Sequence, residues 1–253
     1  MARSSATLPL RESAERFSNS GGPSTSYVRS DRRVKGKSSR SRLLVGIDYG
    51  TTYTSVAYAY IKDEQDANLG SLGVRLSEVQ HIASWHGPYE SPIVPTVTMY
   101  DSSDPSKPKW WGYKVARAID REEAPDTANA VHLAKLLLHK ARETEKETVR
   151  LTGLAQKMGK KDIDLIVDFL RQLYDYLFGD DGYFKQHHAS WLDDADIDFV
   201  FGVPAAWSEP EQQAMIRAAE EAGFTKPSRC SEPEAMAASY FGPHDSSFEV
   251  SYS

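Results

Sequence analysis

Two short apolar runs joined by a glycine turn constrain the fold more than any other feature of this sequence. Leu43 to Asp48 is apolar enough to form a buried strand. Tyr53 to Ile61 alternates β-branched and aromatic residues with small ones, as a second strand does. Gly50, Thr51 and Thr52 stand between the two runs, so the pair predicts a β-hairpin.

Further strands are predicted at three places. Ile93 to Tyr100 is one strand candidate, and Pro95 within it favours an edge or a bulge because proline cannot donate to a ladder. Ile197 to Val203 has the composition of a buried strand, and a short strand is expected around Arg229 to Ser231. Residues 62 to 79 are polar and are expected to connect the hairpin to the next strand.

Helical periodicity is clearest in the middle of the chain. The best helix is predicted between Lys160 and Phe178, where apolar residues recur at spacings of three and four on one core-facing stripe. A short helix containing Val131, Lys135 and Leu138 is predicted before it. The stripe of the long helix consists of Ile163, Ile166, Val167, Leu170, Leu173, Tyr174 and Leu177.

Two more helices follow the predicted strand at Ile197 to Val203. Ser208 to Glu211 has the form of a capping box, and Gly223 stands where a left-handed helix end is expected. Another helix is predicted from Pro233 to Tyr240, since proline suits the first helical turn. Strands that alternate with helices in this way predict an α/β fold.

The charge of the chain is divided between a basic beginning and an acidic body. Residues 1 to 42 hold ten Lys/Arg against three Asp/Glu and contain eleven serines, so we expect a disordered tail. A mitochondrial transit peptide, or a nuclear address at Arg32 to Lys37, remains an alternative for this segment. The rest of the chain carries a net charge of −13, which opposes docking to nucleic acid.

Composition also bears on the compartment. No run approaches the roughly 18 consecutive apolar residues of a membrane helix, so no membrane partner is expected. Cys230 is the single cysteine, cannot form an intrachain disulfide, and is expected to be a buried, inert thiol. A cytoplasmic or nuclear protein fits this composition best.

The strongest local signal for chemistry is the sequence G-I-D-Y-G-T-T-Y at Gly46 to Tyr53. A carboxylate ends a buried strand there, and a Gly-Thr-Thr turn follows directly. Successive amide groups of such a turn form an anion-binding concavity, to which the two hydroxyls add donors. Asp48 is then placed to face Mg²⁺ held through water. The alternative is an ordinary hairpin with a glycine turn.

Three segments together resemble a known family. Gly46 to Tyr53 resembles the first phosphate loop of the actin-like ATPase superfamily, which includes 70-kDa heat-shock chaperones, actin, hexokinase and sugar kinases. Phe201 to Gly223 resembles the chaperones' V-P-A segment, and Ser231 to Tyr240 resembles their E-P-x-A-A-x-x-Y segment. The order and spacing are those of the family, and the similarity is greatest to divergent heat-shock-70-like proteins common in fungi.

The resemblance implies a fold and a ligand. Residues 43 to 241 would form lobe I of an actin-like ATPase (ribonuclease H-like) nucleotide-binding domain, a mixed sheet flanked by helices, with an irregular tail at 242 to 253. The implied ligands are ATP or ADP with Mg²⁺, and the implied activity is ATP hydrolysis coupled to chaperone action in the stress response. Unfolded polypeptides and co-chaperones are the partners that the family suggests.

The resemblance also assigns roles to residues of the first motif. Asp48 matches the strand-end aspartate that orients the hydration shell of Mg²⁺. Gly50, Thr51, Thr52 and Tyr53 match the loop that embraces the β- and γ-phosphates.

Three later residues receive roles in the same way. Lys135 matches the catalytic lysine that approaches the γ-phosphate, the alternative being a lysine on a helix surface. Glu232 matches the glutamate near the metal and the attacking water, the alternative being an acid that complements the helix dipole. Pro204 matches a proline that relays the nucleotide state between lobes, the alternative being a strand terminator.

The sequence departs from the family in one respect. The second phosphate loop, of the type D-x-G-G-G-T, is expected soon after Glu232, but the sequence reaches Ser253 without it. From this departure we expect weak nucleotide binding and little or no ATP turnover. A non-catalytic interaction fragment that retains the fold is one alternative, and a carbohydrate kinase of the same superfamily is another.

Overall fold

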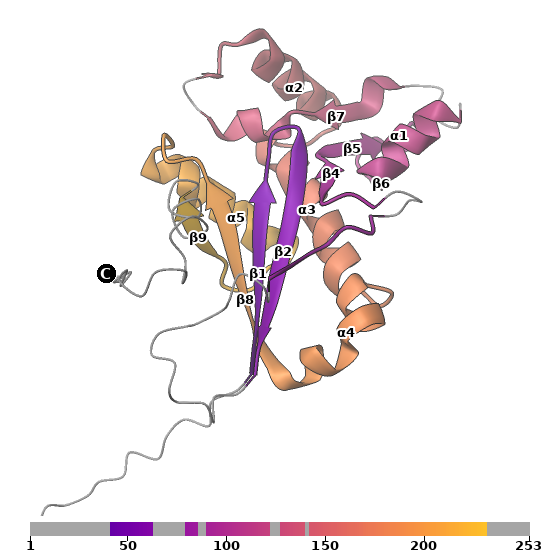
Figure 1. Ribbon diagram of the computed structural model, residues 1–253. Helices are drawn as coiled ribbons and strands as arrows, with labels where there is room; N and C mark the ends of the chain where they lie inside the picture. The colour runs from indigo at the N-terminus through magenta and orange to yellow at the C-terminus, as the bar shows by residue number, and fades with distance from the viewer. Residues whose placement is uncertain (1–40, 63–78, 86–89, 122–126, 140–141, 232–253) are drawn as a thin grey trace, which may run out of the picture. The chain divides into compact units, whose positions relative to one another are not determined.

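The computed structural model describes residues 41–62, 79–85, 90–121, 127–139 and 142–231 (Figure 1). The expected tail at 1 to 42 therefore lies outside the described residues except at its last two positions, which are already part of the first strand. The expected helix from Pro233 to Tyr240, the tail at 242 to 253 and Glu232 also lie outside them. Within the described part, the chain is an α/β protein with a mixed sheet flanked by helices.

The main sheet has the strand order β3-β2-β1-β8-β9, and β4 pairs with β2 as well. β1 and β2 form the antiparallel hairpin that the sequence predicts, with Tyr49 opposite Thr54 at the turn. β8 lies parallel to β1, and β9 lies parallel to β8. The strands are β1 (Ser41–Tyr49), β2 (Tyr53–Ile61), β3 (Gln80–His81), β4 (Ile93–Pro95), β8 (Ala195–Val203) and β9 (Ser228–Ser231).

Alternation along β1 explains how this strand is oriented. Leu43, Val45, Ile47 and Tyr49 are all buried in the main hydrophobic core. The residues between them are half-buried or exposed, and the last of these is Asp48. Since side chains alternate between the two faces of a strand, the carboxylate of Asp48 lies on the face opposite the core.

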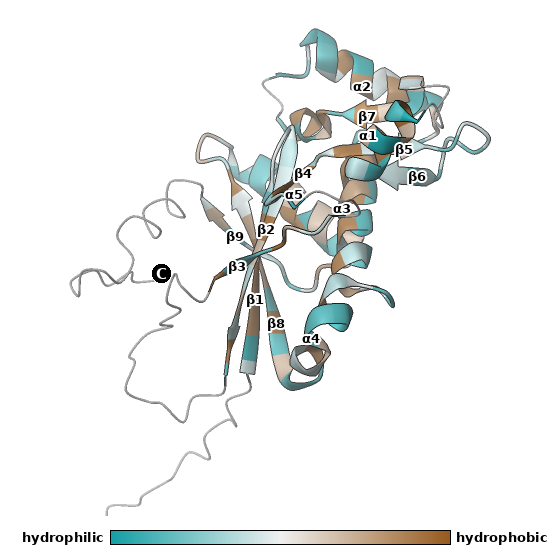
Figure 2. Ribbon diagram, turned by 45° about the vertical axis from the view of Figure 1, so that its right-hand side comes forward, coloured by the Kyte–Doolittle hydropathy of each residue, from teal (hydrophilic) through white to brown (hydrophobic). Residues whose placement is uncertain are grey.

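Helices pack against the core face of the main sheet. α3 (Asp162–Phe178) carries the predicted apolar stripe and packs against α5 (Glu209–Ala222) and α4 (Tyr183–Asp194). Residues 165–170 of α3 are all buried, because this helix also contacts strands of a second sheet. Both views show α3 running between the main sheet and that second group of strands (Figures 1 and 2).

The second sheet is small and has the order β6-β5-β7. Helix α1 (Tyr113–Asp120) packs on it, and Val97, Met99, Val115 and Ala130 form its own apolar cluster. Helix α2 (Lys146–Lys157) follows in the chain and contacts α3. The strands are β5 (Val97–Tyr100), β6 (Pro108–Trp111) and β7 (Ala130–His132).

Two predicted elements differ from the structure. Residues 93 to 100 form two strands in different sheets, because β4 pairs with β2 whereas β5 pairs with β6 and β7. Thr96 lies between the two strands, and its amide donates to Thr52 O at 2.8 Å, which extends the pairing with β2 by one residue. Its hydroxyl also lies 2.8 Å from that of Thr54 in a buried contact. The short helix predicted around Val131 to Leu138 is instead β7 followed by a 3₁₀ turn, η3 (Ala134–Leu138), because Leu133 between them has a left-handed backbone with φ 63°.

Candidate functional site

The β1–β2 turn, residues 50–52, follows Asp48 by one residue. A Cβ atom at Gly50 would lie 2.1 Å from Tyr53 O, so this sharp turn requires glycine. Tyr53 begins β2 and pairs with Pro95 of β4, and 49% of its surface is exposed. The backbone of the turn is therefore tightly constrained, whereas the Tyr53 side chain beside it is exposed to solvent.

The backbone amides of the turn remain available in the described structure. Among the described residues, the backbone hydrogen bonds outside helices and strands include none donated by Gly50, Thr51 or Thr52. The carbonyl of Thr52 accepts from Thr96, which fixes one side of the turn. Thr51 is half-buried and Thr52 is exposed. Such a turn can direct amides and hydroxyls at an anion.

Small residues surround Asp48 on its face of the sheet. Ser55 of β2 is its register partner, and a Cβ at Gly202 of β8 would lie 3.9 Å from Asp48 Oδ1. Gly202 in turn pairs with Cys230 of β9, so these four residues form one row across four strands. Cys230 is half-exposed, so the expectation of a buried thiol is wrong, because its strand ends the sheet among the described strands.

The row suits a hydrated metal better than a directly bound one. Nowhere in the described ranges do three His, Cys, Asp or Glu residues gather as a metal site. Mg²⁺ keeps several of its waters and is commonly bound through one or two carboxylates together with substrate phosphates. The exposed carboxylate of Asp48, flanked by small side chains, fits that kind of ligation.

Three parallel strands end at one edge of the main sheet. β1 ends at Tyr49, β8 at Val203 and β9 at Ser231, and Val203 pairs with Ser231. Pro204 follows β8 directly, and its carbonyl accepts from the amide of Trp207 at 3.1 Å. Glu232 is the next residue in the sequence after β9, outside the described part. The carboxyl edge of parallel strands is where open α/β sheets bind ligands.

Lys135 is a buried lysine in η3, with only 6% of its surface exposed. Its Nζ atom lies 5.2 Å from the centre of the Trp207 ring, within cation–π range. The alternative of a lysine on a helix surface is therefore wrong. Strand β7, which precedes η3, lies toward the turn end of the hairpin in both views (Figures 1 and 2).

Glu211 joins the same region from the first turn of α5. Its Oε2 atom accepts from the amide of Ser208 at 2.6 Å and from the Ser208 hydroxyl at 2.8 Å, which confirms the predicted capping box. Its Oε1 atom lies 2.9 Å from His139 Nδ1. The spacing of Ser208 and Glu211 predicts the cap, but nothing in the sequence signals His139.

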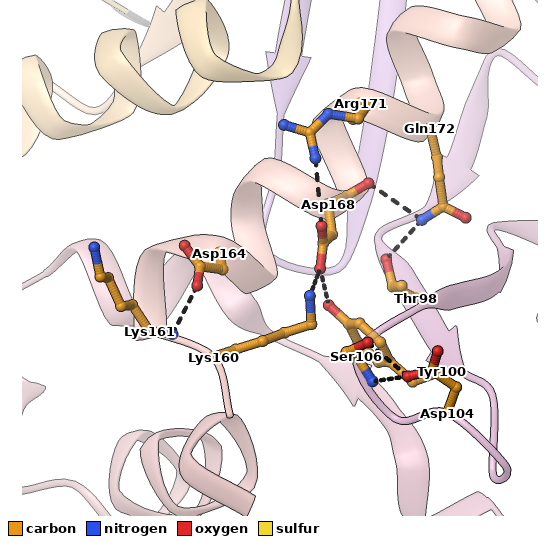
Figure 3. A network of polar contacts seen from close by, with 10 residues as sticks. All are labelled: Thr98, Tyr100, Asp104, Ser106, Lys160, Lys161, Asp164, Asp168, Arg171 and Gln172. Atoms are coloured by element: carbon orange, nitrogen blue, oxygen red, sulfur yellow. Dashed lines mark hydrogen bonds and ion pairs between the residues drawn. The ribbon is translucent and has the colours of Figure 1, made fainter. Parts of the chain in front are cut away.

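A second buried polar cluster lies between α3 and the second sheet (Figure 3). The hydroxyl of Tyr100 donates to Asp168 at 2.8 Å, and Lys160 forms an ion pair with the same carboxylate at 2.9 Å. Arg171 approaches the other oxygen at 3.7 Å. Burial, and then the neighbouring Asp168 carboxylate, raises the pKa of Tyr100 far above its ordinary value. A phenol held neutral in this way acts as a hydrogen-bond donor that joins the second sheet to α3.

Comparison with known proteins gives no family. No protein-family model matches the chain, and no curated protein matches it significantly. In the described part of the chain, every helix is too short or too polar to cross a lipid bilayer.

Proposed function

We propose that this chain binds Mg-ATP or ADP at the β1–β2 turn, as lobe I of the nucleotide-binding domain of a heat-shock-70-like, actin-like ATPase. One observation carries the proposal. Each of the three segments that resemble the family contains the last residue of one of three neighbouring parallel strands, namely Tyr49 of β1, Val203 of β8 or Ser231 of β9. Ligands of open α/β sheets bind outside that edge, so segments far apart in the sequence are available to one ligand.

The residues of the turn supply the phosphate contacts in this proposal. Amides and hydroxyls at Gly50, Thr51 and Thr52 donate to phosphate oxygens, and the absence of a side chain at Gly50 keeps the backbone accessible. Asp48 orients the waters of the metal. Mg²⁺, when bound, neutralises charge that develops on the phosphates during transfer.

Lys135 and Glu232 have supporting roles. The ammonium of Lys135 stabilises negative charge on the γ-phosphate. The resemblance gives Glu232, which is outside the described residues, the role of a carboxylate beside the attacking water. Pro204 directly follows β8 as Gly50 directly follows the neighbouring β1, so it is suited to the relay role that the resemblance gives it. Catalysis in such a site is positioning and charge stabilisation during transfer to water.

The wider identity is proposed on the resemblance. The α/β architecture, with a hairpin beside parallel strands and a small second sheet, is compatible with lobe I of that fold. Chaperone activity, unfolded polypeptides or co-chaperones as partners, and a cytoplasmic or nuclear location follow from the family and composition. Nucleic acid is disfavoured by the acidic body.

Thermal unfolding with and without Mg-ATP tests the site. A ligand that binds only the folded state raises the melting temperature, so Mg-ATP should stabilise the natural chain. Asp48→Asn should abolish that shift. Asp196→Asn is the matched control, since Asp196 is exposed near the opposite end of β8. Equal stabilisation of both variants would place nucleotide binding elsewhere.

The single cysteine offers a second, independent test. Cys230 is half-exposed in the same cross-strand row as Asp48, with Gly202 between them. Bound Mg-ATP should slow alkylation of its thiol in the natural chain and not in Asp48→Asn. A thermal shift without any protection of Cys230 would contradict binding over this row.

A further inference from the structure

We propose that His139 and Glu211 form a positioning pair that fixes Lys135 at the carboxyl edge of the main sheet. The proposal deepens the nucleotide site and rests on it. Glu211 is buried, with 5% of its surface exposed, and its contact with His139 joins α5 to the residue that follows η3. Glu211 lies in the second of the three segments that carry the resemblance, in the cap of α5, whereas His139 lies outside all three.

Two contacts tie η3 to the start of α5, and they have matching spacing. Lys135 lies over the Trp207 ring, and His139 binds Glu211. In both segments the second contact comes four residues after the first. Two contacts, one near each end of the five-residue η3, fix both the distance of η3 from α5 and its rotation relative to α5. A single contact would fix only the distance.

Whether α5 positions η3 or η3 positions α5 depends on which of the two elements is more rigid. α5 has 14 residues, packs on α3, and its first turn is capped by Ser208 and Glu211. η3 is a 3₁₀ turn preceded by the left-handed Leu133, and such short turns have poorer hydrogen-bond geometry. The helix therefore positions the turn.

The chemistry of Glu211 explains why the tie is strong. Oε2 is occupied by Ser208, and Oε1 has His139 within hydrogen-bond distance. A hydrogen bond to a buried carboxylate stabilises the folded state more than one between neutral groups, so the folded state favours His139 in this place. Because η3 carries Lys135, the ammonium is held where the proposed γ-phosphate contact requires it.

The affinities for ATP and ADP test the pair. His139→Ala should weaken ATP binding by about tenfold, the size expected when a hydrogen bond to a charged group is lost. ADP lacks the γ-phosphate, so its affinity should change less than about twofold. His139→Asn, which keeps a donor near the Nδ1 position, should restore most of the ATP affinity. Glu209→Ala, on the same helical turn but exposed, should change neither affinity.

A double variant separates positioning from general destabilisation. If His139 acts through Lys135, His139→Ala should cause no further loss of ATP affinity in a Lys135→Ala background. Additive losses, or an equal loss of ATP and ADP affinity, would overturn the proposal while leaving nucleotide binding intact.

Hydrogen exchange of residues 133–139 without nucleotide keeps the two proposals apart. His139→Ala should accelerate exchange there, and Glu209→Ala should not. If the natural chain binds neither nucleotide, the proposed function fails and the role in ATP recognition fails with it, whatever the exchange shows. Unchanged hydrogen exchange in His139→Ala would overturn the claim that the contact between His139 and Glu211 fixes η3.

Discussion

At the scale of single residues, Gly50 decides whether the turn after Asp48 can exist. We predict that Gly50→Ala lowers the free energy of unfolding by roughly 1–3 kcal/mol, as overpacking against backbone does, and removes stabilisation by Mg-ATP. The cause is the carbonyl of Tyr53, only 2.1 Å from where the new Cβ would lie. Urea unfolding with and without nucleotide measures both effects.

Gly46 provides the matched control for this prediction. It lies on the same strand, and the nearest atom to an added Cβ is Ala57 O at 3.8 Å, an ordinary contact. Gly46→Ala should therefore fold with nearly unchanged stability. If the two variants were equally stable, the turn would be looser than the structure indicates.

His188 gives a prediction about pH at the same scale. Burial lowers the pKa of this side chain below its ordinary value of 6.5, with a smaller effect of His187. As the pH falls, the unfolded chain takes up the proton on His188 before the folded chain does. The free energy of unfolding is therefore unaffected by His188 above pH 6.5, and it decreases as the pH falls from 6.5 toward the lowered pKa of the folded state. His188→Gln should flatten this part of the profile.

The comparison for His188 is His81→Gln, at an exposed histidine of β3. Urea midpoints across mildly acidic pH provide the profile, and the His81 variant should keep the slope of the natural chain. The structural setting is the kink of α4, where His188 stacks on Trp191 at 3.9 Å and lies 3.0 Å from Tyr58 Oη. An unchanged slope in His188→Gln would contradict the assignment.

At the scale of elements, two glycines of helices should respond with opposite signs. Gly223 ends α5 with φ 117°, and an added Cβ would lie 3.2 Å from the Tyr174 ring, so Gly223→Ala should destabilise by about 1–2 kcal/mol. Gly153 lies inside α2 with no atom within 4 Å of an added Cβ, so Gly153→Ala should stabilise by about 0.5–1 kcal/mol. Thermal melts of both variants suffice.

Elements with a strong periodic pattern were predictable from sequence, since burial dictates that pattern. β1, β2, β8 and α3 are of this kind. The division at Thr96 was not predictable, because β4 pairs with β2 while β5 pairs with β7, and both partners are distant in the sequence. The contact between His139 and Glu211 was not predictable for the same reason, since the two residues are 72 positions apart in the sequence. The buried position of Asp168 was not predictable either, because the apolar residues around it predict a uniformly apolar helix face.

At the scale of the whole described structure, the Asp168 cluster joins α3 to the second sheet. Lys160→Met should lower the free energy of unfolding by about 3 kcal/mol, since it leaves a buried carboxylate with weaker compensation. Lys160 and Asp168 side chains are only 13% and 9% exposed, so solvent cannot replace the lost partner. Urea denaturation gives the value.

A double variant checks the cause of that loss. Asp168→Leu combined with Lys160→Met removes the uncompensated charge and should recover much of the stability, because apolar replacements of buried pairs are often neutral. The Tyr100 hydroxyl loses its acceptor in that variant, so recovery should be partial. A double variant less stable than Lys160→Met would mean that the charge is not the cause.

The division of residues 93 to 100 between two sheets has a mechanical consequence. β4 and β5 are successive parts of one continuous peptide, with Thr96 alone between them, and no flexible linker intervenes. The amide of Thr96 also donates a hydrogen bond to the carbonyl of Thr52. Any strain that shifts β5 is therefore transmitted through a single peptide unit to the loop after Asp48, so the geometry of that loop can be tuned by substitutions that never touch it.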